Sequence, residues 1–403
     1  MMRGMAHLHP PLSLTRIQAA LRSTTETLAG ELGRPTEHPP SWNATEWHIA
    51  RATASLHGVS PLLATRLRWS GPAGWQQFLR EQRAHTVARR QRLAALESAL
   101  EVQCVERGVP FVGLKGIQLH ALGLYQPGER PMADLDVLVR PADLAPMEQA
   151  LKALGYRPVD TSWKELVFEA ADGPIASDFG EGGANRLKVD VHWHVSEPLP
   201  RRLVEITPLL LRAPLRAGCN PYPGHAELMC HLLLHAAGEM VLRTLRLIQL
   251  EDIARLSKRM SAADWATLLE LQHRSPGLAW ALPPLALVAR YYEVVPPAVL
   301  ASLRACASGS LRRIARRAQL WQLSYSSLRR RAFPGLGWTA GLERLAYLAA
   351  RTSMGTRALL GSGGTVGTSP PQAARAGAGG WRRLQRVRPA TLYAVHAALA
   401  EAP

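Results

Sequence analysis

The run RPMADLDVLV, from Arg130 to Val139, decides how this chain folds. After a proline-containing loop it continues as an apolar segment typical of a buried strand, yet it carries Asp134 and Asp136 two positions apart. Alternate residues of a strand point to the same face, so both carboxylates are expected on one side of a sheet. A core does not favour two charges there, because burying a carboxylate without a compensating cation is costly.

A second segment repeats this pattern. In KVDVHW, from Lys188 to Trp193, Asp190 stands between two valines. Carboxylate oxygens are the ligands that Mg²⁺ prefers, and water and substrate phosphates complete its coordination. We therefore predict that Asp134, Asp136 and Asp190 form a catalytic site that binds Mg²⁺ or Mn²⁺.

The three acids have distinct expected roles. Two metal ions that bridge a triphosphate need acids at a fixed separation, so that one ion orients the nucleophile and the other stabilises the leaving oxygen. Asp136 is the expected bridging ligand, and Asp190 the acid nearest the attacking hydroxyl. The alternative is structural: Asp134 caps a turn, and Asp190 pairs with Lys188 or Arg186. Three acids in apolar strands favour the metal site.

The tetrapeptide GLKG, residues 113–116, stands one predicted helix upstream of the paired acids. A glycine at a strand-to-helix junction lets the backbone approach a phosphate, and Lys115 adds a positive charge. A tight turn is the commoner reason for such a motif. Arg130, in the following loop, either binds a phosphate or pairs with Asp134 or Glu129. The candidate nucleotide-binding residues are Gly113, Lys115, Gly116 and Arg130.

For four histidines the sequence is compatible with both metal binding and a structural role. His192 and His194 share the strand face of Asp190, so they either bind a transition metal or have structural roles. We expect His192 to contact the metal ligands rather than the metal itself. His231 and His235 lie one helical turn apart, a spacing found in metal sites and more often in structural pairs.

Composition is that of an ordinary globular protein. At 403 residues the chain has room for two or three domains, and it is 47% apolar and 20% charged. No window offers the run of about eighteen apolar residues that spans a membrane. The N-terminus lacks a secretion signal and the four cysteines form no CxxC pair, so we expect a cytoplasmic protein without structural zinc or disulfides.

The chain divides into four predicted regions. Residues 1–107 are helical, and the clearest helix covers 75–105. A small mixed sheet is expected over 108–200, from strands near 109–114, 135–140, 164–170 and 187–195. Residues 201–334 return to helices, the strongest over 225–257, in which Asp252 is expected to cap or pair within its own helix. Residues 335–403 form a tail rich in Gly, Pro and Arg, predicted to be partly disordered. Helices, a small mixed sheet and helices again predict an α+β architecture.

The net charge of +17 is concentrated at the C-terminal end. Residues 301–403 contain sixteen arginines and only two acidic residues, Glu343 and Glu401. Such a region attracts nucleic acid, anionic lipid or a phosphorylated partner. Because aromatic residues do not interleave with the arginines, a solvated basic surface is the favoured interpretation.

Together these residues resemble a known family. GLKG, Tyr125, RPMADLDVLV and KVDVHW are similar to the uncharacterised bacterial nucleotidyltransferase family within the DNA polymerase beta-like superfamily. The resemblance covers residues 105–195 well and extends loosely through the helical segment 231–256. It implies that the paired acids and Asp190 bind two divalent ions, and that the turn at Lys115 and Gly116 faces the nucleotide phosphates. Better-studied members carry Gly-Ser or Gly-Gly at that turn.

The resemblance implies an Mg²⁺-dependent enzyme that moves a nucleoside monophosphate from a nucleoside triphosphate to a hydroxyl or phosphate acceptor. Members of this branch resemble accessory enzymes of peptide natural-product or polysaccharide gene clusters, so the implied acceptor is a small molecule or a peptide. Two alternatives stay open. One is a nucleotide-binding module without catalysis, and the other is a nucleic-acid-modifying protein that uses the basic C-terminal quarter.

Overall fold

Four helices lie between residues 14 and 106. The structure, a computed structural model, describes residues 14–171, 184–199, 202–271 and 277–324. A capping box starts one helix, since the Asn43 side chain accepts the N–H of Glu46 and the Glu46 carboxylate accepts the N–H of Asn43. The helix predicted over 75–105 is slightly longer and ends just before Gly108, whose φ of 67° suits glycine. These helices are α1 (Leu14–Gly33), α2 (Ala44–Leu56), α3 (Ser60–Arg66) and α4 (Ala73–Glu106).

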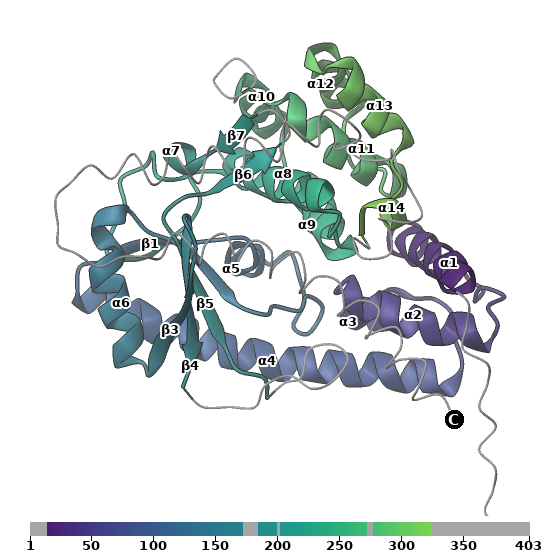
Figure 1. Ribbon diagram of the computed structural model, residues 1–403, viewed down its shortest axis with the longest axis horizontal. Helices are drawn as coiled ribbons and strands as arrows, with labels where there is room; N and C mark the ends of the chain where they lie inside the picture. Colours follow the sequence, from purple (N-terminus) through teal and green to yellow (C-terminus); the bar gives the residue numbers. More distant parts are fainter. Residues whose placement is uncertain (1–13, 172–183, 200–201, 272–276, 325–403) are drawn as a thin grey trace, which may run out of the picture.

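A mixed six-stranded sheet follows, with the strand order β3-β4-β5-β2-β1-β8 (Figure 1). β2 pairs parallel with β5 and antiparallel with β1, and β1 pairs parallel with β8. A mixed sheet between helical regions confirms the predicted α+β fold class. The strands are β1 (Pro110–Gly113), β2 (Leu135–Leu138), β3 (Tyr156–Thr161), β4 (Glu165–Ala170), β5 (Lys188–His192) and β8 (Gly218–Asn220), and the short helices between them are α5 (Gly116–Ala121), η1 (Pro141–Asp143) and α6 (Leu144–Ala153).

The sequence does not predict two of these strands. β3 lies at an edge of the sheet and is exposed after Tyr156, so its sequence has no alternation of apolar and polar residues. β8 has only three residues and lies beyond position 200, where the predicted sheet region ends. The sheet thus includes a strand from the region predicted to be helical.

The helix predicted over 225–257 is two helices, so that prediction is wrong. The first helix ends where Arg243 adopts a left-handed backbone with a φ of 61°, and the second begins after Arg246. The turn LRTLR contains neither glycine nor proline, and the sequence therefore gives no signal for the break. The elements of this region are β6 (Ser196–Leu199), β7 (Arg202–Glu205), α7 (Thr207–Leu210), α8 (His225–Leu242), α9 (Leu247–Ser257), α10 (Ala262–Glu270), η3 (Ala279–Ala281), α11 (Leu282–Tyr291), α12 (Pro297–Cys306), α13 (Gly309–Arg317) and α14 (Leu320–Ser324).

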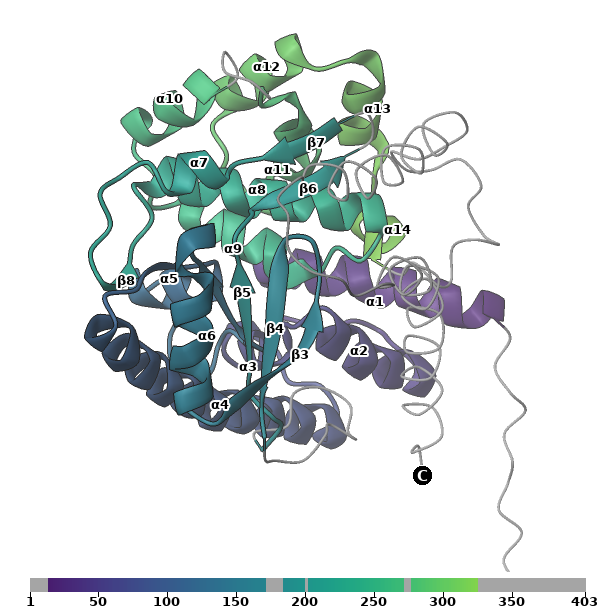
Figure 2. The same cartoon turned by 60° about the vertical axis from the view of Figure 1, so that its left-hand side comes forward.

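The two faces of the sheet pack against different helices. Val137, Val189 and Val191 are buried in one cluster with residues of α4 and α6, so they mark the face that these helices cover. Alternation turns the residues between them to the other face. On that face Leu138 joins the buried cluster of α8 and α9. In Figure 1 α4 runs below the sheet and α8 and α9 above it, and Figure 2 shows α10, α12 and α13 on the far side of α8 and α9.

Some predictions fall on other parts of the chain. The tail predicted over 335–403 lies outside the described residues, as does most of the connection between β4 and β5. Within the described ranges, no helix is both long enough and apolar enough to span a bilayer.

Candidate active site

The register of the sheet brings Asp136 and Asp190 side by side. β2 and β5 run parallel, and Asp136 is the pairing partner of Asp190. The apolar neighbours of both acids, Leu135, Val137, Val189 and Val191, point to the face covered by α4 and α6, so the carboxylates share the opposite face. Asp134 directly precedes β2 and lines the same cavity, which has a volume of about 310 Å³. The three predicted acids therefore open into one cavity between the sheet and the helices α8 and α9.

Negative charge is crowded in this cavity. Burial, followed by the neighbouring Asp134 and Asp136, raises the pKa of Asp190 to about 8. Its Oδ1 is buried and has no hydrogen-bond partner among the residues that the structure describes. Burial and Asp136 also raise the pKa of Asp134. An orphaned carboxylate oxygen in a crowd of acids is a position where a bound cation lowers the free energy.

Asp136 is the best compensated of the three acids. Burial opposes its ionisation, but Lys115 and His192 hold its pKa well below the usual range. The Lys115 ammonium lies 3.2 Å from Asp136 Oδ1, and His192 Nε2 lies 2.9 Å from the same oxygen. The other ring nitrogen of His192 faces Glu165 Oε2 at 3.3 Å. Asp136 is therefore held ionised in a fixed orientation.

The donor atoms fit a divalent cation. Asp136, Asp190 and His192 each offer one ligand atom, and these atoms lie within 4.8 Å of one another. Asp190, whose Oδ1 is buried without a hydrogen-bond partner among the described residues, is one of the three. Asp134 is not part of this group of three, although it lines the same cavity. Two carboxylates with a third nearby form an oxygen-rich site that suits Mg²⁺ or Mn²⁺.

The GLKG turn lies at the edge of this cavity. β1 ends at Gly113 and α5 begins at Gly116, so Lys115 is the turn residue, with an unusual φ of 42°. A Cβ on Gly116 would lie 2.7 Å from Nη1 of Arg130, which explains the glycine by close packing. α5 has only six residues. Because the helix is so short, the positive charge that this turn contributes to the cavity comes from the Lys115 side chain and not from a helix dipole.

Arg130 and Asp252 pair with each other across 122 positions of sequence. Nε and Nη2 of Arg130 each donate to one Asp252 oxygen at 2.8 Å, and the Tyr125 hydroxyl donates to the same carboxylate at 2.7 Å. The prediction that Asp252 caps or pairs within its own helix is wrong, and so is pairing of Arg130 with Asp134 or Glu129. The loop before β2 packs on α9, and sequence proximity does not reveal that contact. Arg130 also lines the cavity.

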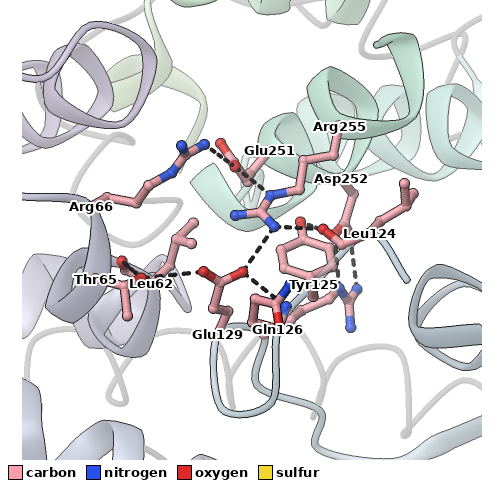
Figure 3. Close-up of polar contacts among 11 residues, drawn as sticks. Leu62, Thr65, Arg66, Leu124, Tyr125, Gln126, Glu129, Glu251, Asp252 and Arg255 are labelled. Carbon is pink, nitrogen blue, oxygen red and sulfur yellow. Dashed lines mark hydrogen bonds and ion pairs between the residues drawn. The ribbon is translucent and has the colours of Figure 1, made fainter. Parts of the chain in front are cut away.

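This pair belongs to a larger buried network (Figure 3). Arg255 donates to Glu129 at 2.9 Å and to Glu251 at 2.7 Å, and its guanidinium lies over the Tyr125 ring. Arg66 of α3 reaches Glu251 at 3.4 Å. The network joins α3, the loop before β2 and α9, and thereby fixes the helical wall of the cavity relative to the sheet.

Two predicted histidines form part of that helical wall. The Tyr222 hydroxyl accepts the Lys115 N–H at 3.3 Å and is hydrogen-bonded to Nδ1 of His231 at 2.6 Å. Burial, followed by Lys115, holds the pKa of His231 and of His235 well below the usual range, so both are neutral.

Two of the predicted histidines bond to groups other than the three acids. His235 Nε2 lies 2.8 Å from the Gln249 amide nitrogen. His194 Nδ1 bonds Glu205 at 2.6 Å, away from Asp136. Among the described residues, none of these histidines joins a group of three potential metal ligands.

Other residues that line the cavity are not predicted from the sequence. They include Lys164, Glu165, Glu197, Glu239, Arg246 and Gln249. Most lie on β4, β6, α8 or α9, and none belongs to the strand motifs that carry the acids. Only the three-dimensional packing of the helices on the sheet reveals them.

Comparison with known proteins agrees with this geometry. A family model described as an uncharacterised nucleotidyltransferase matches residues 43–292, from the start of α2 to the end of α11. The match includes both the sheet wall and the helical wall of the cavity. No curated protein and no solved structure matches the chain significantly. The chain therefore belongs to this uncharacterised nucleotidyltransferase family, and its general role is nucleotidyl transfer.

Proposed function

We propose that this protein transfers a nucleoside monophosphate from a nucleoside triphosphate to a hydroxyl or phosphate group of a small molecule or peptide. The acceptor oxygen bonds to the α-phosphorus, the bond to the β-phosphate oxygen breaks, and pyrophosphate leaves. The observation that carries the proposal is the in-register pair Asp136 and Asp190 with its orphaned, buried carboxylate oxygen. The acids outnumber the cationic groups beside them, and divalent ions that accompany the triphosphate would supply the missing positive charge.

The acids would hold two Mg²⁺ or Mn²⁺ ions, which neutralise charge on the phosphates and polarise the reacting oxygens. Asp136 is suited to contact both ions, because Lys115 and His192 keep it ionised. Asp190 is the acid that we assign to the side of the attacking hydroxyl. Asp134 is the third ligand, since it opens into the same cavity.

Two groups of the chain position the nucleotide in this proposal. Lys115 lies between the acids and the turn that follows β1, where it can contact a phosphate once cations take its place at Asp136. Nη1 of Arg130 lies against Gly116, while Asp252 holds the other two guanidinium nitrogens. These contacts support a phosphate-binding role for Lys115, Gly116 and Arg130, with Gly113 allowing the turn.

Substitution of Asp136 tests the proposal. We expect Asp136→Asn to lower Mg²⁺-dependent pyrophosphate release at least about a thousandfold, equivalent to about 4 kcal/mol of barrier, because the amide binds metal poorly. The assay incubates the protein with the four labelled triphosphates, Mg²⁺ and a host extract, and mass spectrometry identifies the species that gains a nucleotide.

The matched control is Asp143→Asn, an acid in the turn after β2 that does not line the cavity. It is expected to keep full activity. Folded Asp136→Asn that retained wild-type pyrophosphate release with the authentic acceptor would disprove the proposed site.

A further inference from the structure

The cations that line the cavity are not equivalent. Within the described ranges they are Lys115, Arg130, Lys164 and Arg246. The first three are neutralised: Lys115 by Asp136 at 3.2 Å, Arg130 by Asp252 at 2.8 Å and Lys164 by Glu197 at 3.2 Å. Arg246 is exposed, and no carboxylate of the described residues lies within ion-pair distance of it.

The backbone that carries Arg246 is firmly held. The Arg246 N–H donates to Gln249 Oε1 at 2.8 Å, and the Leu247 N–H donates to Nδ1 of His57 at 2.9 Å. The next N–H, of Ile248, donates to the His57 carbonyl at 3.1 Å. These bonds occupy the N–H groups at the start of α9, so the helix terminus itself is not an anion site. The charge available to a ligand is the guanidinium.

Arg246 faces the acids across the cavity. It stands on the helical wall, whereas Asp134, Asp136 and Asp190 stand on the sheet wall. Burial and Asp136 raise the pKa of Asp134, and the charges of Lys115 and Arg246 oppose that rise. Arg246 is therefore close enough to act on this acid electrostatically without forming an ion pair with it.

We infer that Arg246 binds the pyrophosphate portion of the nucleotide, the part that leaves in the reaction. This inference rests on the proposed function. With the α-phosphate at the acids, the β- and γ-phosphates extend from the sheet wall and need a cation that no carboxylate already neutralises. A guanidinium matches them, because its fork of N–H donors bonds two phosphate oxygens at once. His231 lines the same cavity.

Calorimetric titration tests the assignment. The full-length protein, Arg246→Gln, Arg246→Lys and Arg259→Gln are titrated in Mg²⁺ with inorganic pyrophosphate, with each nucleoside triphosphate and with each monophosphate. Arg246→Gln should weaken pyrophosphate and triphosphate binding about 10- to 100-fold, the range for a hydrogen-bonded charge, and leave monophosphate binding unchanged. Arg246→Lys should recover part of the loss. Arg259, exposed at the other end of α9 and outside the cavity, should have no effect.

Each other outcome has a distinct meaning. Unchanged pyrophosphate affinity in folded Arg246→Gln would overturn the inference while leaving the proposed function intact. An increase in KM confined to a phosphorylated acceptor would assign Arg246 to the acceptor and overturn it as well. Wild-type protein that binds neither pyrophosphate nor any triphosphate in Mg²⁺ would refute the proposed function itself, and the inference with it.

Discussion

Two neighbouring clusters of buried charged residues in this molecule differ in their balance of positive and negative charge. One, the balanced network, contains three arginines and three acids and is shown in part in Figure 3, and the other, the acid cluster, contains three acids and one lysine. The balanced network consists of Arg66, Arg130, Arg255, Glu129, Glu251 and Asp252. The acid cluster consists of Asp134, Asp136 and Asp190, with Lys115.

This difference in balance distinguishes a cluster that stabilises the fold from a cluster that we propose binds a ligand. Opposite charges with good hydrogen bonds offset much of the cost of desolvation, so a balanced network is stable without any additional ion. Crowded like charges are unfavourable, and proteins keep them where a bound cation or substrate relieves the repulsion. Removal of an acid should therefore have opposite effects on stability in the two clusters.

The largest expected effect on stability is in the balanced network. Asp252→Asn should lower the free energy of unfolding by about 3–5 kcal/mol, because Arg130 then remains buried without its counter-ion. Urea denaturation followed by circular dichroism measures the change.

Glu148→Gln is the control for that experiment. It removes a surface ion pair, with Lys152 at 2.8 Å, and should change stability by less than about 0.5 kcal/mol. Equal effects of the two substitutions would mean that the buried network contributes no more than a surface pair does.

Removal of an acid from the acid cluster should instead increase the stability of the metal-free protein. Asp190→Asn is expected to stabilise the metal-free protein by about 1–2 kcal/mol at pH 8 and to abolish both activity and stabilisation by Mg²⁺. The pKa of Asp190 is raised to about 8, above the value near 3.8 of the unfolded chain. A raised pKa contributes stability that is complete below pH 4 and is lost as the pH rises through 8. Thermal melts at pH 5 and pH 8, with and without Mg²⁺, measure these effects.

Wild-type protein should gain more from Mg²⁺ at pH 8 than at pH 5, because at pH 5 protons compete for the carboxylates. The metal-free Asp190→Asn variant should lose less stability than the wild type between these two pH values. Parallel loss in both proteins, or destabilisation by Asp190→Asn, would show that Asp190 is balanced by groups of the chain and needs no cation.

The sequence predicts the acid cluster better than the balanced network, and the reason is local pattern. Apolar strands with an acid at alternate positions indicate both the sheet and the face that carries Asp136 and Asp190. The register of β2 with β5 brings these two acids together, and alternation within each strand does not specify that register. The part of the sheet that depends on long-range pairing, β8, is missed.

The balanced network has no comparable pattern. Asp252 lies on an amphipathic helix and Arg130 in a loop, and either residue has several plausible partners nearby in sequence. Their actual partnership depends on how the loop packs on α9. The sequence also does not predict the position of Arg246. This residue follows a break between two helices that no glycine or proline marks, and the packing of those helices places it at the cavity.

The smallest expected effect concerns the bond that joins the two walls of the cavity. Tyr222→Phe removes the hydroxyl between the Lys115 N–H and His231, which should lower stability by about 1 kcal/mol. It should also shift the tautomer equilibrium of His231, because Nδ1 loses its partner, and reduce activity several-fold. Nitrogen NMR of the imidazole reports the tautomer, and kinetics report the activity.

Tyr291→Phe is the matched control. The Tyr291 hydroxyl donates to Glu26 at 2.6 Å and does not line the cavity, so this variant should lose similar stability and keep full activity. If Tyr222→Phe kept both the tautomer and the activity, the helical wall would only cover the acids and would take no part in binding.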